Sequence, residues 1–575
     1  MNPLSILRAR RLTRPHLLAL AAALALPATV GAQNNNWQCA GGGWNGDTAC
    51  WSRNLTPNNT QDVVVNGGPT DTNLMLLHAI GNTIAARSLT LGTDRTSPTP
   101  SATAQLYLSG STLNVGSPTG LPVGSVRVGQ GNNANATLNL TNGSTLNLLP
   151  NQNGDFFGDV SVGSFATAQT GFGALSVQGG ARITGGSVYI HNGRLDVHGS
   201  STPGYVAINR PVHVRNYAGV VGAGVANIAA SVNQVLVERG RATLGTTTVG
   251  FQSPVFNQVV VYSPNVSGIE NNAVDFVGRS VVTNLWLQGG VTSIKGGANV
   301  DNNSGRTLLS GDGQLIVESG GSLNTADILF NQVGGSIQLK GGTINHRGID
   351  NAGSVSGTGV IVSALQTQTF KQQSNGFVFA SGGDLTIVGR FDGSAGGTLG
   401  TQNGRLFFYG DALLEAGQVI TQSGTGRLIA FRNKVEIGNA TQRGSLEAMT
   451  ADLALQNTSN LFLDFGGVTD HDYLSTGGKL LVEGGKLTLS TAGSFRAGLG
   501  SFYNVFRAAS GIIGTFSNID ATAFALAPGA RLDMSNLYST GTLAVVAVPE
   551  PATWLSLGAG LLLIGARARR WRQMA

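Results

Sequence analysis

The chain has 575 residues, of which 84 are glycine, and only 11% of its side chains are charged and 6% aromatic. This glycine content is roughly twice the average of about 7%, but the glycines follow no three-residue period, which excludes a collagen-like chain. A hydrophobic fraction of 41% with few charges also excludes a disordered chain. Glycine combined with many β-branched residues instead predicts numerous short strands joined by tight turns.

The formal net charge of +6 is concentrated at the two ends of the chain. Residues 1–32 contain four arginines and no acid, and the segment from residue 549 onward contains four arginines and one glutamate. Residues 33–548 therefore carry a net charge of −1. Such a nearly neutral body has no general attraction to phosphate, so no nucleic-acid partner is expected.

The first 32 residues have the three parts of a secretory signal peptide. Arginines come first, residues 17–26 form an apolar stretch, and Val30, Gly31 and Ala32 supply the small residues of a cleavage site. The alternative, an N-terminal membrane helix, is disfavoured because the apolar stretch is short. We expect export by the Sec machinery and cleavage by signal peptidase after Ala32.

The two cysteines, Cys39 and Cys50, lie in the segment WQCAGGGWNGDTACW. Export places them in an oxidising compartment, and the glycine-rich residues between them can close a short loop. We therefore predict a disulfide that stabilises a local N-terminal cap. A reactive or metal-binding thiol pair is the alternative, but no histidine lies nearby in the sequence.

The body of the chain repeats a unit in which a short strand, a Gly-Gly corner and a second strand follow one another. The clearest copies are GQLIVESGGSL (313–323), GSIQLKGGTI (335–344) and GKLLVEGGKL (478–487). When the first two copies are aligned, Leu315 matches Ile337 and Val317 matches Leu339, which is a step of 22 residues. Two further repeats have steps of 33 and 34 residues: GSTLN (110–114 and 143–147), and VRVG (126–129) followed by VSVG (160–163).

Each unit alternates with a period of two, so that Leu315 and Val317 point to one face and their neighbours to the other. A strand of this length cannot bury its apolar face alone, so stacked copies must share a core. We predict an all-β fold, a right-handed parallel β-solenoid or β-helix, with positive φ at the Gly-Gly corners. The Asn-rich residues 129–147 predict stacked amide ladders. Tandem antiparallel β-sandwiches, whose hairpins also use Gly-Gly turns, are the alternative.

The predicted organisation has five segments. Terminal β caps are expected because a stacked core must be covered at both ends, and aromatic residues gather there. The segments are a signal peptide (1–32), an N-terminal cap with the disulfide (33–100), a β-repeat solenoid (101–460), a C-terminal β cap (461–548), and a C-terminal tail with one hydrophobic helix (549–575).

The tail, VPEPATWLSLGAGLLLIGARARRWRQMA, combines three features. Pro549, Glu550 and Pro551 come first, residues 552–566 are uncharged, and a basic cluster that includes Arg567, Arg569 and Arg570 follows. As a helix the uncharged run spans about 22 Å, short of a hydrocarbon core of about 30 Å. Arginine snorkelling could make up part of the difference, which predicts a marginal transmembrane helix that contacts the inner membrane transiently. A permanent anchor and a buried soluble helix are the alternatives.

These three features resemble the PEP-CTERM sorting domain. The resemblance implies recognition of Pro549, Glu550 and Pro551 by an exosortase, removal of the arginine-rich tail, and a Gram-negative host that makes exopolysaccharide and biofilm. The tryptophan-rich start, the glycine-bracketed strands and the ending FYNVFRAASGIIGTFSNID…NLYSTGTLAV resemble autotransporter-like surface proteins with β-strand repeats. Together the two resemblances cover nearly the whole mature chain.

A search for catalytic or metal-binding groups finds two weak candidates. His191 and His198 flank Asp196 in YIHNGRLDVHG, but no further ligand completes a metal site. Asp470, His471 and Asp472 form the densest polar cluster, beside a Gly-Gly corner, where an exposed loop is the simpler reading. Calcium-loop and phosphate-loop patterns are absent from the sequence, so no cofactor is expected.

Polysaccharide cleavage is the serious enzymatic alternative, because β-helices carry lyases and hydrolases. Such enzymes need clustered carboxylates or an acid beside a base, and the acids of this chain are scattered. We therefore expect a protein that is not an enzyme. It would be an exported structural or adhesive protein of the cell surface or extracellular matrix, with exopolysaccharide or neighbouring surface proteins as possible partners.

Overall fold

The structure is a computed structural model of the whole chain, and the account below is confined to the residues whose placement it describes. They are residues 33–66, 75–93, 103–116, 124–130, 133–150, 158–164, 171–191, 193–198, 206–208, 212–215, 225–229, 231–232, 235–238, 241–244, 247–249, 258–262, 273–365, 367–414, 418–423, 428–438, 443–548 and 551–572. The predicted signal peptide and its cleavage site at Ala32 lie outside these residues, as do Pro549 and Glu550.

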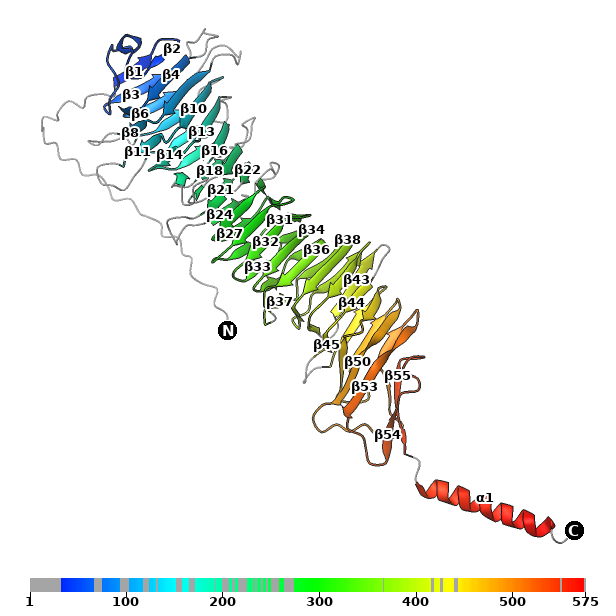
Figure 1. Ribbon diagram of the computed structural model, residues 1–575. Coiled ribbons are helices and arrows are strands. Elements are labelled where there is room, and N and C mark those ends of the chain that lie inside the picture. The colour runs from blue at the N-terminus through cyan, green and yellow to red at the C-terminus, as the bar shows by residue number, and fades with distance from the viewer. Residues whose placement is uncertain are drawn as a thin grey trace, which may run out of the picture.

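The molecule is an elongated stack of short strands, with β1 at one end and β53 toward the other; within the described residues one α-helix lies beyond the stack (Figure 1). Nearly all described strands pair in parallel, and their sheets are open. The prediction of a mostly β protein with one C-terminal helix is therefore confirmed. The alternative prediction, tandem antiparallel β-sandwiches, is wrong for this body. Each short strand pairs in parallel with strands two or three elements before and after it, and not in antiparallel fashion with the next strand, as in a hairpin.

The pairings form three ladders that the chain visits in turn, and we call one strand of a ladder a rung. The first ladder contains β1 (Gln33–Trp37), β3 (Gln61–Val65), β6 (Ser88–Leu91), β9 (Val126–Val128), β12 (Val160–Val162), β15 (Val188–Ile190), β18 (Val212–Arg215), β21 (Val235–Glu238), β24 (Gln258–Tyr262), β27 (Asn284–Gln288), β30 (Thr307–Leu309), β33 (Leu329–Asn331), β35 (Ile349–Asn351), β37 (Thr369–Gln372), β39 (Arg390–Gly393), β42 (Ala412–Leu414), β45 (Lys434–Ile437) and β48 (Asn460–Phe465). The second contains β2 (Gly41–Gly43), β4 (Met75–Ile80), β7 (Ala104–Ser109), β10 (Asn135–Thr141), β13 (Phe172–Val177), β16 (Gly193–His198), β19 (Val225–Ala229), β22 (Arg241–Leu244), β25 (Ala273–Phe276), β28 (Val291–Ile294), β31 (Gln314–Glu318), β40 (Thr398–Gln402), β43 (Gln418–Ser423), β46 (Ser445–Ala448), β49 (Tyr473–Thr476) and β52 (Phe506–Ala508). The third contains β5 (Thr83–Ala86), β8 (Thr112–Val115), β11 (Thr145–Leu148), β14 (Arg182–Thr184), β17 (Val206–Ile208), β20 (Ser231–Val232), β23 (Thr247–Val249), β26 (Arg279–Val282), β29 (Asn299–Asn302), β32 (Ser322–Thr325), β41 (Arg405–Phe408), β44 (Leu428–Phe431) and β47 (Asp452–Leu455).

Five longer strands bend and belong to two ladders each. They are β34 (Ser336–His346), β36 (Ser354–Ser363), β38 (Phe377–Val388), β50 (Leu480–Thr491) and β53 (Ile512–Ala523). The predicted boundaries at residues 100/101 and 460/461 are crossed by pairings such as β6 with β9 and β47 with β50. Those boundaries stay predictions.

The sequence repeats are register partners in these ladders. Leu315 pairs with Ile337, and Val317 with Leu339, as the 22-residue step predicts. The two GSTLN copies align through Leu113 and its partner in β11, and VRVG and VSVG align through β9 and β12. The parallel register read from the repeats is thus confirmed at all three steps.

The Gly-Gly corners have the predicted backbone conformation, but two of the three do not interrupt a strand. Gly320, Gly341 and Gly484 have φ values of 76°, 90° and 93°. Gly320 turns the chain between β31 and β32, whereas Gly341 and Gly484 lie inside β34 and β50, where the strand bends from one ladder into the next. The positive φ, which L-residues rarely adopt, is what permits the bend.

Alternation of buried and outward residues places a continuous apolar core inside the stack. β31 is typical, since Leu315 and Val317 are fully buried and the residues between them are not. In the second half of the body four phenylalanines pack in a row through this core, with ring centroids 5.5, 4.8 and 5.1 Å apart. Phe370 and Phe391 lie on neighbouring rungs of the first ladder, and Phe408 and Phe431 on neighbouring rungs of the third.

Amide side chains form hydrogen-bonded ladders, as predicted. In the Asn-rich region the Nδ2 of Asn147 donates to the Oδ1 of Asn114 at 3.0 Å. Another amide ladder, on the first strand ladder, is fully buried: Asn331 donates to Asn351 at 2.7 Å, and Asn351 donates to Gln372 at 2.8 Å. Each amide meets the amide one rung away, which gives the buried Nδ2 groups of Asn331 and Asn351 an acceptor.

At the N-terminal end the outer edge of β1 is covered by the residues around Cys50. Gln38 N–H donates to the Cys50 carbonyl, and Ser52 N–H donates to the Asn36 carbonyl, both at 2.8 Å. Cys39 and Cys50 are joined by a disulfide, and the three buried tryptophans of this end, Trp37, Trp44 and Trp51, pack edge to face beside it. Covering an exposed edge in this way prevents pairing with another chain.

At the C-terminal end a small antiparallel sheet follows the parallel stack. It consists of β51 (Phe502–Asn504), β55 (Thr542–Ala547) and β54 (Ala530–Asp533). Tyr503, Leu543 and Val545 from this sheet are buried in the same hydrophobic core as the last parallel rungs. The last element is the helix α1 (Pro551–Arg572), which projects away from the β structure (Figure 1).

Candidate functional site

The tail predicted as a sorting signal forms a helix whose large apolar side chains are exposed to solvent. Pro551 begins α1, a position at which its missing N–H has no helical partner to lose. Large apolar side chains along the helix are between 58% and 76% exposed: Leu555, Leu557, Leu561, Leu562, Leu563, Ile564 and Trp571. Arg567, Arg569 and Arg570 are exposed at the far end. These apolar side chains are not buried in the hydrophobic core of the β structure, so they are accessible to a protein that recognises the helix.

The expected transmembrane helix is not found. Among the described helical residues, none form a helix that is both long enough and apolar enough to cross a membrane. The physical reason lies in the sequence, because the uncharged run stops after residue 566 and arginines fill the last turns of α1.

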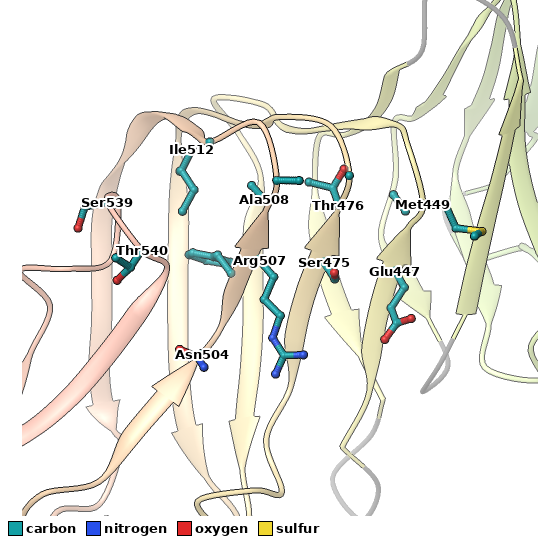
Figure 2. A pocket seen from close by; sticks show the side chains of 15 residues that line it. Glu447, Met449, Ser475, Thr476, Asn504, Arg507, Ala508, Ile512, Ser539 and Thr540 are labelled. Atoms are coloured by element: carbon teal, nitrogen blue, oxygen red, sulfur yellow. The ribbon is translucent and has the colours of Figure 1, made fainter.

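A second candidate is an open groove on the outside of the stack near its C-terminal end (Figure 2). Its floor is formed by β46, β49 and β52, three successive rungs of the second ladder, and the turn at Ser539 and Thr540 borders it. The cavity volume is about 670 Å³. This lies within the range of about 300–1,000 Å³ common for ligand sites.

The polar side chains of the groove come from register partners. Glu447 pairs with Ser475, and Ser475 pairs with Arg507. Alternation turns all three outward, and Figure 2 shows Ser475 between Arg507 and Glu447, whose side chains point to the same side. Tyr473 links the two charged residues: its hydroxyl donates to Glu447 Oε1 at 2.6 Å, and the Arg507 guanidinium carbon lies 4.3 Å from its ring centroid.

The sequence-predicted cluster of residues 470–472 does not form one site. Asp470 is exposed, whereas the ring of His471 stacks on Phe465, with centroids 5.8 Å apart. Asp472 is buried and accepts hydrogen bonds from the N–H groups of Gly444 and Asp464. Burial lowers the pKa of His471 and raises the pKa of Asp472 to about 7. The three side chains therefore point into different surroundings, and a shared hydrolytic site there is not supported by the geometry.

The other predicted cluster is also dispersed. Asp196 accepts a hydrogen bond from Arg194 at 2.8 Å, and His191 is buried near Tyr189, with ring centroids 6.3 Å apart. His198 ends β16, and its side chain lies outside the description. Over the described ranges no three His, Cys, Asp or Glu residues come together in a way that could hold a metal ion.

Sequence reasoning missed the groove because its residues are far apart in the chain. Glu447, Ser475 and Arg507 are separated by 28 and 32 residues, and no motif marks any of them. The signal that could have found them is the strand register, since each occupies an outward position of a short strand with alternating burial.

Comparison with known proteins adds one finding. Residues 547–570 match the family described as the PEP-CTERM protein-sorting motif. No curated protein matches the chain. The match leaves the β body uncovered, so its likeness to autotransporter-like repeat proteins stays a prediction. The C-terminal segment is thus a PEP-CTERM sorting signal, and the chain is an exported protein that exosortase processes and that is directed to the cell surface or the extracellular space.

Proposed function

We propose that this exported protein is a structural or adhesive component of the cell surface or extracellular matrix, which binds exopolysaccharide or neighbouring surface proteins without cleaving them. Export through the Sec machinery and removal of residues 1–32 by signal peptidase precede this role. The observation that carries the proposal is a long stack with an outward face of amides, hydroxyls and paired charges. Examples of that pairing are Lys295 with Glu318 at 2.8 Å and Lys486 with Asp520 at 2.9 Å, each across neighbouring rungs.

The body that presents this face is, in our proposal, a right-handed parallel β-solenoid with a β cap at each end. What supports it is the parallel register at steps of 22, 33 and 34 residues, the covered edge of β1 and the antiparallel sheet after the last rung. The handedness follows from the strong preference of parallel crossover connections for a right-handed path. An electron-microscopic map of the exported protein tests it directly, and a left-handed winding would contradict it.

The functional test uses the mature protein purified from the producing cells and the exopolysaccharide of the same cells. Co-sedimentation should show binding, while size-exclusion chromatography of the polymer should show an unchanged length and no unsaturated ends. Shortened polymer would overturn the proposal in favour of a secreted polysaccharide lyase or hydrolase. Absence of binding to both polymer and cells would overturn it as well.

Removal of the tail is tested by intact mass. The sorting signal implies that the mature protein lacks the arginines of α1. A purified species that retains Arg567 to Arg570 would contradict this processing step. Replacing Pro549 and Pro551 by alanine should prevent removal of the tail, so that the purified protein retains the mass of the arginine-rich segment.

A further inference from the structure

We infer that the outer groove on β46, β49 and β52 binds a carboxylated saccharide, with the Arg507 guanidinium as the ligand of the sugar carboxylate. The inference rests on the proposed function, because it names the class of polymer that the body would bind and the place where it would bind it.

Arg507 is held in position but is not neutralised. Its guanidinium lies against the ring of Tyr473, and the side chain is exposed. Contact with an aromatic ring restricts the guanidinium, so part of its entropy is lost before any ligand arrives, and the ring does not take up its fork of N–H donors. No described carboxylate forms an ion pair with Arg507, whose partner on the neighbouring rung is Ser475.

This arrangement differs from the paired charges elsewhere on the stack. Arg405 forms an ion pair with Asp384, and Arg279 one with Asp301 at 3.4 Å, in each case across neighbouring rungs. At Arg507 the nearest acid of the same outward line is Glu447, two rungs away. Rungs are about 4.8 Å apart, so the two backbones are separated by about 10 Å. Glu447 and Arg507 both contact Tyr473 but form no ion pair with each other, so Arg507 keeps its hydrogen-bond donors free of a described carboxylate.

The remaining groups of the groove suit sugar hydroxyls. Glu447 uses Oε1 to accept the Tyr473 hydroxyl, which leaves Oε2 as an acceptor for a ligand hydroxyl. Ser475 lies between the two charges and Thr540 borders the groove, each with a hydroxyl that can donate or accept (Figure 2). A ligand that fits must combine one carboxylate with several hydroxyl groups.

The same chemistry disfavours other anions. A polyphosphate chain or nucleic acid would place repeated negative charge along the line and meet the carboxylate of Glu447. A saccharide carrying single carboxylates among hydroxyls instead matches a cation at one end of the line and an acceptor at the other. Bidentate binding of a carboxylate by arginine is also stronger and more directional than binding by a neutral donor.

The test uses the full exported protein and an oligogalacturonate of defined length, with its carboxyl-reduced neutral counterpart as the matched probe. Isothermal calorimetry should show that wild type prefers the charged oligosaccharide. Arg507→Gln should weaken its binding by about tenfold or more and leave the neutral oligosaccharide unaffected. Arg507→Lys, which keeps the charge but loses the fork, should give an intermediate affinity.

Arg531→Gln is the control, because Arg531 is an exposed arginine on β54 outside the groove. It should bind as wild type does, and circular dichroism should show that all three variants are folded. Equal affinities of Arg507→Gln and wild type, or no preference of wild type for the charged probe, would overturn the inference. If wild type still binds the host exopolysaccharide or the producing cells in that case, only the inference fails; if it binds neither the polymer nor the cells, the proposed function fails too.

Discussion

Asp472 carries a carboxyl group that the surrounding backbone holds inside the molecule. It is 1% exposed, and its oxygens accept the N–H groups of Gly444 at 2.7 Å and Asp464 at 2.8 Å. Burial raises its pKa to about 7, and the negative charge of Asp464 acts in the same direction. The hydrogen bonds and Arg443 oppose this rise but do not cancel it. The residue ties the start of β46 to β48, which is a structural role.

The sign of the resulting pH dependence follows from this pKa. The folded state retains a proton that the unfolded chain releases near pH 4, so the stabilisation is complete below about pH 4 and is lost as the pH rises to about 7. His346, whose pKa burial lowers to about 4, acts in the opposite direction and loses stabilisation as the pH falls below about 6.5. The contribution of Asp472 must therefore be measured as a difference between variants.

Asp472→Asn should flatten the pH dependence of stability. In wild type the Asp472 contribution to the free energy of unfolding should fall by about 2–4 kcal/mol between pH 4 and pH 8, and the variant should lack this fall. Urea unfolding of both proteins at a series of pH values measures it. Asp533→Asn, at a turn on β54 where a Ser535 hydrogen bond lowers the pKa, is the control. A variant that keeps the wild-type slope would show that another group titrates.

At the scale of the strand, glycine decides where the stack can bend. β36 and β38 each pass from one ladder into the next and contain glycines with positive φ, among them Gly357 in β36 and Gly382 in β38. The two positions differ in what surrounds them. A Cβ at Gly357 would lie 1.9 Å from the Leu339 carbonyl oxygen of the preceding rung, whereas a Cβ at Gly382 would meet nothing within 4 Å. The first glycine is needed for close approach of two strands, and the second only for backbone conformation.

This contrast predicts unequal effects of the same substitution. Gly382→Ala, with φ of 74°, should cost about 1–2 kcal/mol of backbone strain. Gly357→Ala adds a clash with main-chain atoms that cannot move without breaking the ladder, and should cost about 3 kcal/mol or more. Thermal unfolding of the two variants beside wild type tests the order. Equal losses would mean that the strands can separate to accept a methyl group.

At the scale of the whole molecule, stability is expected to be local along the stack. Each rung contacts mainly its neighbours, so a change at one end should not spread through the body. The N-terminal end depends on the disulfide loop that covers β1 and on the tryptophans packed beside it. The C-terminal end depends instead on the antiparallel sheet of β51, β54 and β55.

Replacing Cys39 and Cys50 together by serine should therefore loosen one end only. By loop closure the cross-link contributes about 3 kcal/mol, and its loss should raise amide hydrogen exchange in β1 and β3. Exchange in β50 and β53 should stay as in wild type, which serves as the internal control. Hydrogen-exchange mass spectrometry reads both ends in one experiment. Uniform loss of protection along the chain would show that the molecule unfolds as one unit.

Much of the architecture could be predicted because the repeats carry their own register. The pairing of Leu315 with Ile337 follows from aligning two similar segments, and the period of two fixes which residues are buried. The sorting signal could also be predicted, because its three features are contiguous. The short apolar run and its flanking arginines predicted a marginal transmembrane helix, but no described helix is both long and apolar enough, because the arginines end the run instead of extending it.

The amino-acid sequence by itself determined that the chain is mostly β, which faces its strands bury, which of its repeated segments pair, and how the protein is sorted. These properties depend on neighbouring residues or on similar segments, both of which can be recognised in the linear sequence. Only the tertiary structure decided where Arg507, Tyr473 and Glu447 meet, that residues 470–472 diverge, and which glycine touches another rung. The physical reason is that loops of varying length separate the rungs, so residues about 30 positions apart become neighbours only when the strands stack.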